Sequence, residues 1–160
     1  MKKILVLSNI FLLLITFGYS VSKEETNLKK YSFYLKLNPV DPRSLIQGDY
    51  MNLDYQIIND SYKDLKNLKK GYIKIYTDEQ NIGHYMDVQN SLTSLSKNEK
   101  LIYFIKNYNT LDIGANSFFF QEGQRYLFQN AKYAEVIILK NGKLRLKYLL
   151  DKNLKIIKTK

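Results

Sequence analysis

The 160-residue sequence contains no cysteine, no tryptophan, two prolines and one histidine. Without cysteine, the chain can form no disulfide, bind no metal through thiolates and use no cysteine nucleophile. One histidine is too few for the common zinc sites, and we expect a surface or packing role for His84. EF-hand-type loops, G-x-S-x-G motifs and glycine-rich phosphate-binding motifs are also missing. We therefore expect no metal site, no cofactor and no catalytic set.

Aromatic residues are plentiful by contrast. The chain has 14 tyrosines and 8 phenylalanines, and 45% of its residues are hydrophobic while 25% are charged. This composition is typical of a globular protein, because large aromatic side chains supply the apolar surface that a core needs. The length that remains after an N-terminal targeting segment suffices for one domain but not for two.

The chain is strongly basic, with a formal net charge of +10. Lys2 and Lys3 belong to the N-terminal segment, so the rest of the chain carries +8. One interpretation is an anionic partner, such as lipid headgroups or an acidic wall polymer. The other is compositional bias, because 22 of the 25 basic residues are lysines and the sequence is also rich in asparagine, isoleucine and tyrosine. We favour the compositional interpretation.

The first twenty residues have the features of an export signal. Two lysines precede an apolar run from Ile4 to Phe17, and the small residues Gly18 and Ser20 permit cleavage after Ser20. Alternatively, residues 4–21 form an uncleaved membrane anchor of the minimum useful length. Both interpretations place the remaining chain outside the cytoplasm.

The expected domain organisation follows from this segment. Residues 1–22 form a signal peptide or signal-anchor helix, residues 23–30 a charged stalk, and residues 31–160 a β-rich extracytoplasmic domain. We expect the chain to sit in the inner or cytoplasmic membrane through its single N-terminal helix, or to be secreted or periplasmic after cleavage near Ser20. Export and the presence of only three arginines argue against a nucleic-acid partner.

Alternating apolar residues predict strands along the rest of the chain. The clearest pattern spans Tyr50–Ile58, where every second residue from Met51 onward is apolar. The other predicted strands cover residues 31–37, 71–77, 84–88, 100–106, 134–140, 143–150 and 154–158. Helical turns are predicted at 62–68 and 124–131, a loop at 107–116 and a type I′ turn at Asn141-Gly142. The pattern predicts a mainly β fold, a single small antiparallel domain that is either barrel-like or sandwich-like.

Residues 39–55, PVDPRSLIQGDYMNLDY, resemble the GDYXXLXY family of bacterial proteins. The motif residues are Gly48, Asp49, Tyr50, Leu53 and Tyr55. The apolar N-terminus, the phenylalanine-rich strand before Glu122-Gly123 and the closing hairpin support the same resemblance. It implies a small, singly anchored protein that is often encoded near multi-span membrane proteins. Such a membrane protein is therefore an expected partner, and no particular activity is implied.

The motif has two physical interpretations, and the sequence does not distinguish between them. As a structural corner, Gly48 allows a turn with positive φ, Asp49 binds the turn or Arg43, and Leu53 and Tyr55 enter the core. Tyr50 points the opposite way, toward the corner at residues 39–42. As a binding groove, the same corner is lined by polar and aromatic side chains, namely Arg43, Asp49, Tyr50 and Glu122.

Three functions fit these observations. The leading hypothesis is a non-catalytic accessory or binding domain that contacts a membrane or envelope partner. The second is an envelope hydrolase in which Asp49 and Glu122 act as acid and base, which requires their carboxyls to lie within about 5–10 Å. The third is a secreted domain that binds an anionic polymer through its net positive surface.

Overall fold

The computed structural model describes residues 8–20, 31–38, 50–65, 68–108, 110–121 and 123–158. The chain divides into two compact units, Met1–Ser32 and Phe33–Lys160. In the first unit, residues 8–20 are helical and carry exposed apolar side chains. Within the ranges given above, no helix is both long enough and apolar enough to cross a membrane. The ends of the predicted 4–21 segment and the predicted stalk at 23–30 lie outside the described residues.

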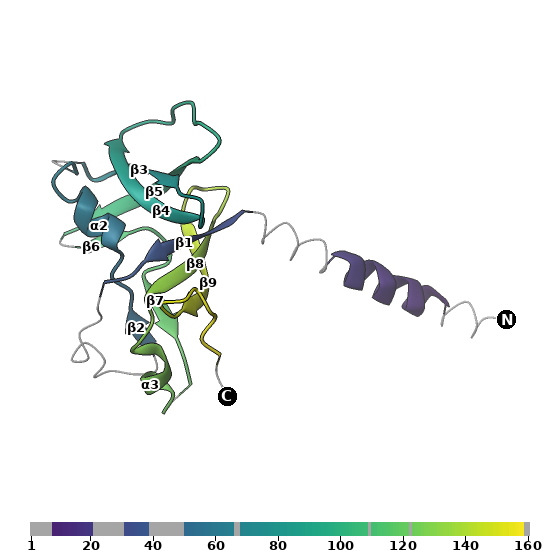
Figure 1. Ribbon diagram of the computed structural model, residues 1–160. Helices are drawn as coiled ribbons and strands as arrows, with labels where there is room; N and C mark the ends of the chain where they lie inside the picture. Colours follow the sequence, from purple (N-terminus) through teal and green to yellow (C-terminus); the bar gives the residue numbers. More distant parts are fainter. Residues whose placement is uncertain are drawn as a thin grey trace. The chain divides into compact units, whose positions relative to one another are not determined.

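The second unit is mainly β, as predicted. Its described part contains nine strands and two short helices, shown in Figure 1: β1 (Ser32–Lys36), β2 (Tyr50–Asn52), α2 (Gln56–Ser61), β3 (Lys70–Thr77), β4 (Ile82–Gln89), β5 (Glu99–Asn107), β6 (Thr110–Asp112), β7 (Ser117–Phe119), α3 (Arg125–Phe128), β8 (Tyr133–Ile138) and β9 (Leu144–Leu150).

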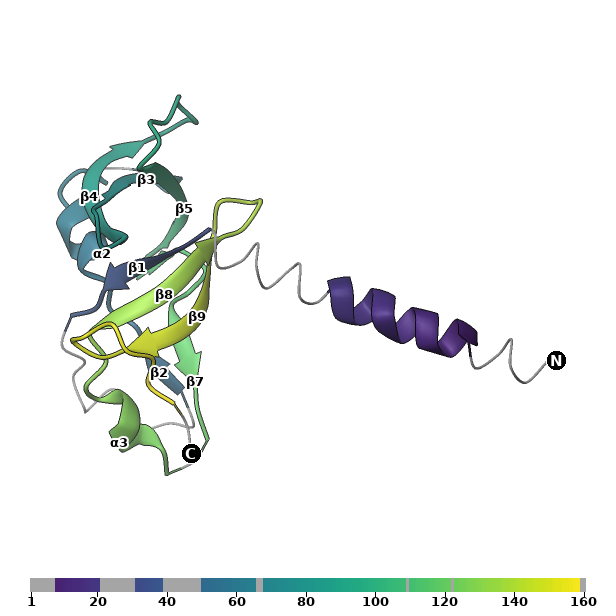
Figure 2. The ribbon, with the colours of Figure 1, turned by 45° about the vertical axis from the view of Figure 1, so that its right-hand side comes forward.

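Seven of these strands form one sheet in the order β6-β5-β3-β4-β1-β8-β9, while β2 and β7 form a separate two-stranded ribbon. The larger sheet is strongly curled around β3, β4 and β5, giving half of a barrel rather than a flat sandwich layer (Figure 2). The prediction of an antiparallel sheet is wrong at one pair, because β1 runs parallel to β4, with Tyr34 opposite Ile82. Parallel neighbours require a crossover connection, and here the chain passes through β2, α2 and β3 before it returns as β4.

The strand predicted at Tyr50–Ile58 is much shorter in the structure. β2 ends at Asn52 and α2 begins at Gln56. The alternation nevertheless reports burial correctly, because the exposed fractions of Met51, Leu53, Tyr55 and Ile57 are 2%, 5%, 0% and 2%. An extended segment keeps alternate residues on one side even without a ladder, and Ile57 then faces the core from the helix. A period of two therefore indicated which residues are buried, but not which pairings they make.

Local predictions elsewhere are partly correct. Strands occur where they were expected over β1, β3, β4, β5, β8 and β9, and α3 lies inside the segment predicted as a short helix. The other helix precedes its predicted position, and β6 lies inside a predicted loop. Residues 154–158 contribute an isolated bridge, Leu150 to Ile156, instead of a strand.

The turn between β8 and β9 is not of type I′. Gly142 has a φ of 80°, but Asn141 does not share the positive φ that a type I′ turn requires at both central residues. The Gly142 N–H donates to the Leu139 carbonyl at 2.9 Å, and the Leu139 N–H donates to the Lys143 carbonyl at 2.8 Å. The loop therefore contains three residues, with glycine at the position that needs the left-handed conformation.

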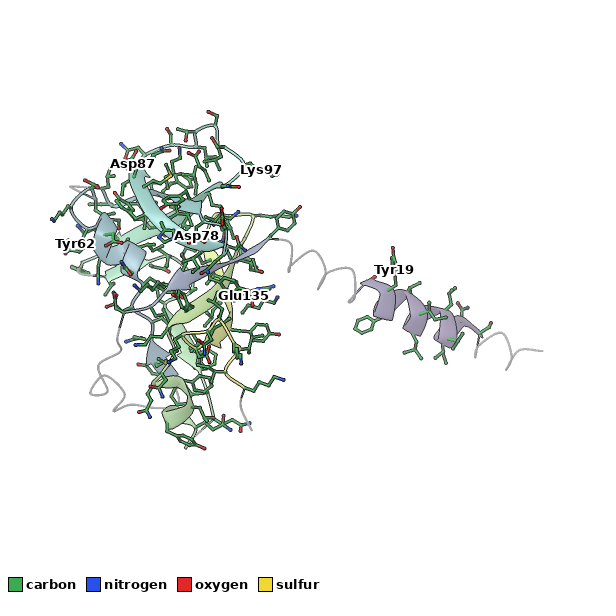
Figure 3. All side chains as sticks on the ribbon, in the orientation of Figure 1. Tyr19, Tyr62, Asp78, Asp87, Lys97 and Glu135 are labelled. Carbon is green, nitrogen blue, oxygen red and sulfur yellow. The ribbon has the colours of Figure 1, made fainter. Side chains whose placement is uncertain are left out.

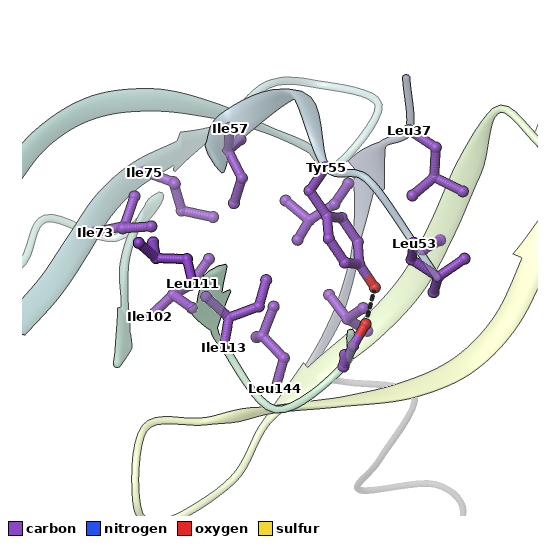
Figure 4. Packing of buried hydrophobic residues seen from close by; sticks show 14 of the residues in the cluster. Leu37, Leu53, Tyr55, Ile57, Ile73, Ile75, Ile102, Leu111, Ile113 and Leu144 are labelled. Atoms are coloured by element: carbon purple, nitrogen blue, oxygen red, sulfur yellow. Dashed lines mark hydrogen bonds between the residues drawn. The ribbon is translucent and has the colours of Figure 1, made fainter. Parts of the chain in front are cut away.

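The core lies on the concave side of the curled sheet and includes the inner part of the family-like motif. Figure 4 shows Tyr55 and Leu53 packed beside aliphatic side chains from several strands. The largest fully buried side chains come from β1, β3, β5, α3, β9 and the segments that connect the elements: Phe33, Leu35, Tyr55, Leu65, Ile73, Ile75, Ile102, Phe104, Ile113, Phe128, Leu144 and Leu149. Such a shared core explains how the domain is held together without disulfides.

Candidate functional surfaces

Among the family-motif residues and the residues of the predicted groove, the structure describes three: Tyr50, Leu53 and Tyr55. Four others lie outside the described residues: Arg43, Gly48, Asp49 and Glu122. The predicted corner, the groove at that corner and the Asp49–Glu122 carboxylate pair therefore stay predictions. The described motif residues divide into an inner and an outer group.

Tyr55 belongs to the inner group. Its side chain is completely buried, and its hydroxyl donates a hydrogen bond of 2.7 Å to the Ala115 carbonyl (Figure 4). Burial raises the pKa of this hydroxyl, because the phenolate would lose its hydration. The backbone N–H of Leu53 donates to the Asn116 carbonyl at 2.8 Å. Two bonds thus fasten the inner motif to the segment between β6 and β7, so Leu53 and Tyr55 are structural.

The segment between β6 and β7 that accepts these bonds is stabilised by hydrogen bonds of its own. The Asn116 side chain accepts the Ile113 N–H at 3.1 Å and donates to the Leu111 carbonyl. Gly114 has a φ of 95°, and a Cβ atom there would meet the Leu144 carbonyl oxygen at 2.6 Å. Only glycine fits this close approach of two backbone segments. The acceptor for the Tyr55 hydroxyl is therefore held in place by short-range hydrogen bonds.

Tyr50 belongs to the outer group and lies directly opposite Phe119 in the ribbon of β2 and β7. Their ring centroids are 5.8 Å apart, a distance typical of aromatic pairs. The exposed fractions are 38% for Tyr50 and 74% for Phe119. Asn52 and Ser117 lie opposite each other on the same side. We call the side formed by Tyr50, Asn52, Ser117 and Phe119 the ribbon face.

The opposite side of the ribbon borders a groove. Phe118 packs edge-on against Phe128 with centroids 4.7 Å apart, and Phe120 lies 5.6 Å from the same ring. A groove of about 420 Å³ opens beside this cluster. We call it the C-terminal groove, and it is lined by Phe118, Phe128, Lys147, Tyr148, Leu149, Ile156, Ile157 and Lys158.

A more polar cleft of about 390 Å³ lies beside α2 and β4, lined by Lys36, Gln56, Ile57, Asp60, Ile82, Gly83, His84, Tyr85 and Tyr133. The His84 Nε2 lies 2.8 Å from the Asp78 carboxylate (Asp78 is labelled in Figure 3). The other Asp78 oxygen accepts the N–H groups of Gln80 and Ile82, each at 2.9 Å. Slight burial acts to raise the pKa of Asp78, but the hydrogen bonds from His84 and from these backbone groups outweigh it and lower that pKa.

The carboxylate–imidazole pair was missed in the sequence, although Asp78 directly follows one predicted strand, 71–77, and His84 begins the next, 84–88. It completes a hairpin turn, and the His84 ring stacks on Tyr76 with centroids 5.1 Å apart. The stacking on Tyr76 is a packing contact of the kind expected for His84, whereas the hydrogen bond to Asp78 was not predicted. Among the described residues, no group of three or more metal-binding side chains comes together.

A model of the GDYXXLXY protein family matches residues 12–149, which is most of the chain. The chain therefore belongs to this family, and the resemblance noted at residues 39–55 is confirmed. No curated protein matches the chain significantly, and neither does any solved structure.

Proposed function

We propose that this GDYXXLXY family member is a non-catalytic binding domain of the bacterial envelope. In this proposal the N-terminal segment holds the domain at the membrane, and the ribbon face contacts a multi-span membrane protein. The observation that carries the proposal is the exposed aromatic pair of Tyr50 and Phe119, with Phe119 at 74% exposure. Tyr50 is itself one of the family-motif residues.

The chemistry of the ribbon face supports a protein contact. Aromatic residues are enriched at the centres of protein interfaces, where a rigid ring buries a large area at a small cost in conformational entropy. Tyr50 and Phe119 are held by a regular antiparallel pairing, so both rings project from a defined backbone. Asn52 and Ser117 beside them supply hydrogen-bonding groups for a polar rim.

The proposal is tested by site-specific photocrosslinking of the full chain in membranes of its native host. A benzophenone amino acid at position 119 is expected to yield one discrete adduct with a membrane protein. The matched control is the same amino acid at position 108, because Tyr108 is 99% exposed and lies between β5 and β6, outside the ribbon of β2 and β7. Tyr50→Ala is expected to weaken the adduct at 119.

Two outcomes would contradict the proposal. The first is the absence of any adduct from position 119 in repeated experiments with the protein at its normal level, which would mean that this position contacts no partner. The ribbon face would also lose its special role if positions 119 and 108 gave the same set of adducts.

A further inference from the structure

We propose that the C-terminal groove binds an anionic amphiphile, a molecule with an acyl chain and an acidic headgroup. The proposal is independent of the partner proposed for the ribbon face, because it concerns the opposite side of the ribbon. It rests on the apolar lining of the groove, on its basic rim and on the way in which the chain covers the neighbouring sheet edge.

The lining of the groove suits an acyl chain. Phe118, Phe128 and Leu149 form its inner part, while Tyr148 and Ile156 are each 42% exposed at its surface. A pocket of about 420 Å³ with mainly apolar walls and a few polar groups is typical of small-molecule sites. When a ligand covers exposed large apolar side chains beside such a groove, the removal of apolar surface from water favours binding.

The walls of the groove are fixed by backbone contacts before any ligand arrives. The Ile157 N–H donates to the Leu149 carbonyl at 2.9 Å, and Leu150 forms a bridge with Ile156. These contacts place the C-terminal segment against β9, as both ribbon views show (Figures 1 and 2). A preformed groove loses little conformational entropy on binding.

The same contacts decide between an acyl chain and an added peptide strand. β9 is the last strand of the large sheet, and an exposed sheet edge is a common docking site for extended peptides. Here residues 156 and 157 already occupy that edge at residues 149 and 150. Recognition in the groove therefore depends on side chains rather than on backbone pairing, which favours a ligand without a peptide backbone.

Two lysines give the rim its charge complementarity to an acidic headgroup. The Lys147 Nζ lies 3.2 Å from a carboxylate oxygen of Glu135 and 5.5 Å from the centroid of the Tyr148 ring. Lys158 also lines the groove, and in the described part of the chain no carboxylate lies within ion-pair distance of it. The rim thus carries two ammonium groups but one carboxylate, which pairs with Lys147, and the surplus positive charge attracts an anion.

Isothermal titration calorimetry of the full chain with dodecanoic acid, below its micellar concentration, tests the proposal. We expect single-site binding that is lost with acetate, which has no acyl chain, and with dodecyltrimethylammonium, which has the opposite charge. Ile156→Asp is expected to weaken binding by more than about tenfold, because it places a charge in the apolar wall. Lys158→Gln is expected to weaken it about two- to fivefold, the size of one exposed ion pair.

Lys152→Gln is the matched control, because Lys152 lies in the turn after β9 and does not line the groove. It removes the same charge and is expected to leave the affinity unchanged. Thermal melting of each variant separates loss of binding from loss of folding. Lys158→Gln keeps the proposal testable if Ile156→Asp fails to fold, because it changes an exposed charge without disturbing the apolar wall.

Three outcomes would overturn the proposal. The first is binding of dodecyltrimethylammonium as tight as that of dodecanoic acid. The second is dodecanoic acid binding that is insensitive to Ile156→Asp in a folded variant, which would place the ligand on another part of the chain. The third is binding of an acidic, aromatic peptide in place of dodecanoic acid. None of these results would alter the crosslinks expected from position 119, so the two proposals fail separately.

Discussion

Tyr50 and Tyr55 belong to the same family motif, yet they have opposite surroundings. Tyr55 is fully buried and its hydroxyl is bound to the Ala115 carbonyl, whereas Tyr50 is 38% exposed and pairs with a ring that is itself mostly exposed. The inner end of the motif therefore contributes to folding, and the outer end is available for contacts. Membership of a family motif does not by itself distinguish these two roles.

The largest expected effect is that of Tyr55→Ala. Removing this ring leaves a cavity in the core, and the free energy of unfolding should fall by about 3–5 kcal/mol. The measurement is urea denaturation at neutral pH. Tyr108→Ala is the control, because Tyr108 is 99% exposed and should change the free energy of unfolding by less than about 0.5 kcal/mol. A similar loss in both variants would contradict the assignment of Tyr55 to the core.

An intermediate effect is expected from alkaline pH. Burial raises the pKa of the Tyr55 hydroxyl above its value of about 10 in the unfolded chain, so the unfolded state releases this proton first. The stabilising contribution is complete below about pH 10 and is lost as the pH rises above it, by at most about 1.4 kcal/mol per pH unit.

Tyr55→Phe isolates this contribution. The variant should be about 1–3 kcal/mol less stable at neutral pH, because the buried Ala115 carbonyl loses its donor, but its stability should fall less steeply above pH 10. Denaturation curves between pH 7 and 11 measure both effects. The alkaline slope of Tyr55→Phe is compared with that of Tyr85→Phe, because the pKa of the Tyr85 hydroxyl is also raised, by burial and then by a hydrogen bond to Asp64. An unchanged alkaline slope in Tyr55→Phe would mean that other tyrosines dominate it.

The smallest effect on stability is expected from Tyr50→Ala. This change removes one aromatic pair at a partly exposed position, and the loss should stay below about 1.5 kcal/mol. The same urea denaturation measures it. A loss as large as that of Tyr55→Ala would show that the outer end of the motif also stabilises the fold, and the contrast between the two tyrosines would disappear.

Residues close together in the sequence were the ones that could be predicted. Alternation marked Met51, Leu53, Tyr55 and Ile57 as inward-facing, and all four are buried, although β2 is only three residues long. The antiparallel neighbours β3–β4 and β8–β9 were predictable for the same reason, since short turns join them. The parallel pair β1–β4 and the pair β2–β7 were not, because each joins segments far apart in the chain.

The candidate sites also divide into features that depend on local residue order and contacts that depend on the fold. The sequence alone identified the family, the mainly β class and the inward side of the motif, because each of these depends on local residue order. Only the tertiary structure placed Phe119 opposite Tyr50, and Phe118 and Phe128 beside Tyr148 in a groove. Such neighbours arise when distant segments bury their apolar sides together, and no local pattern records which distant segment will be chosen.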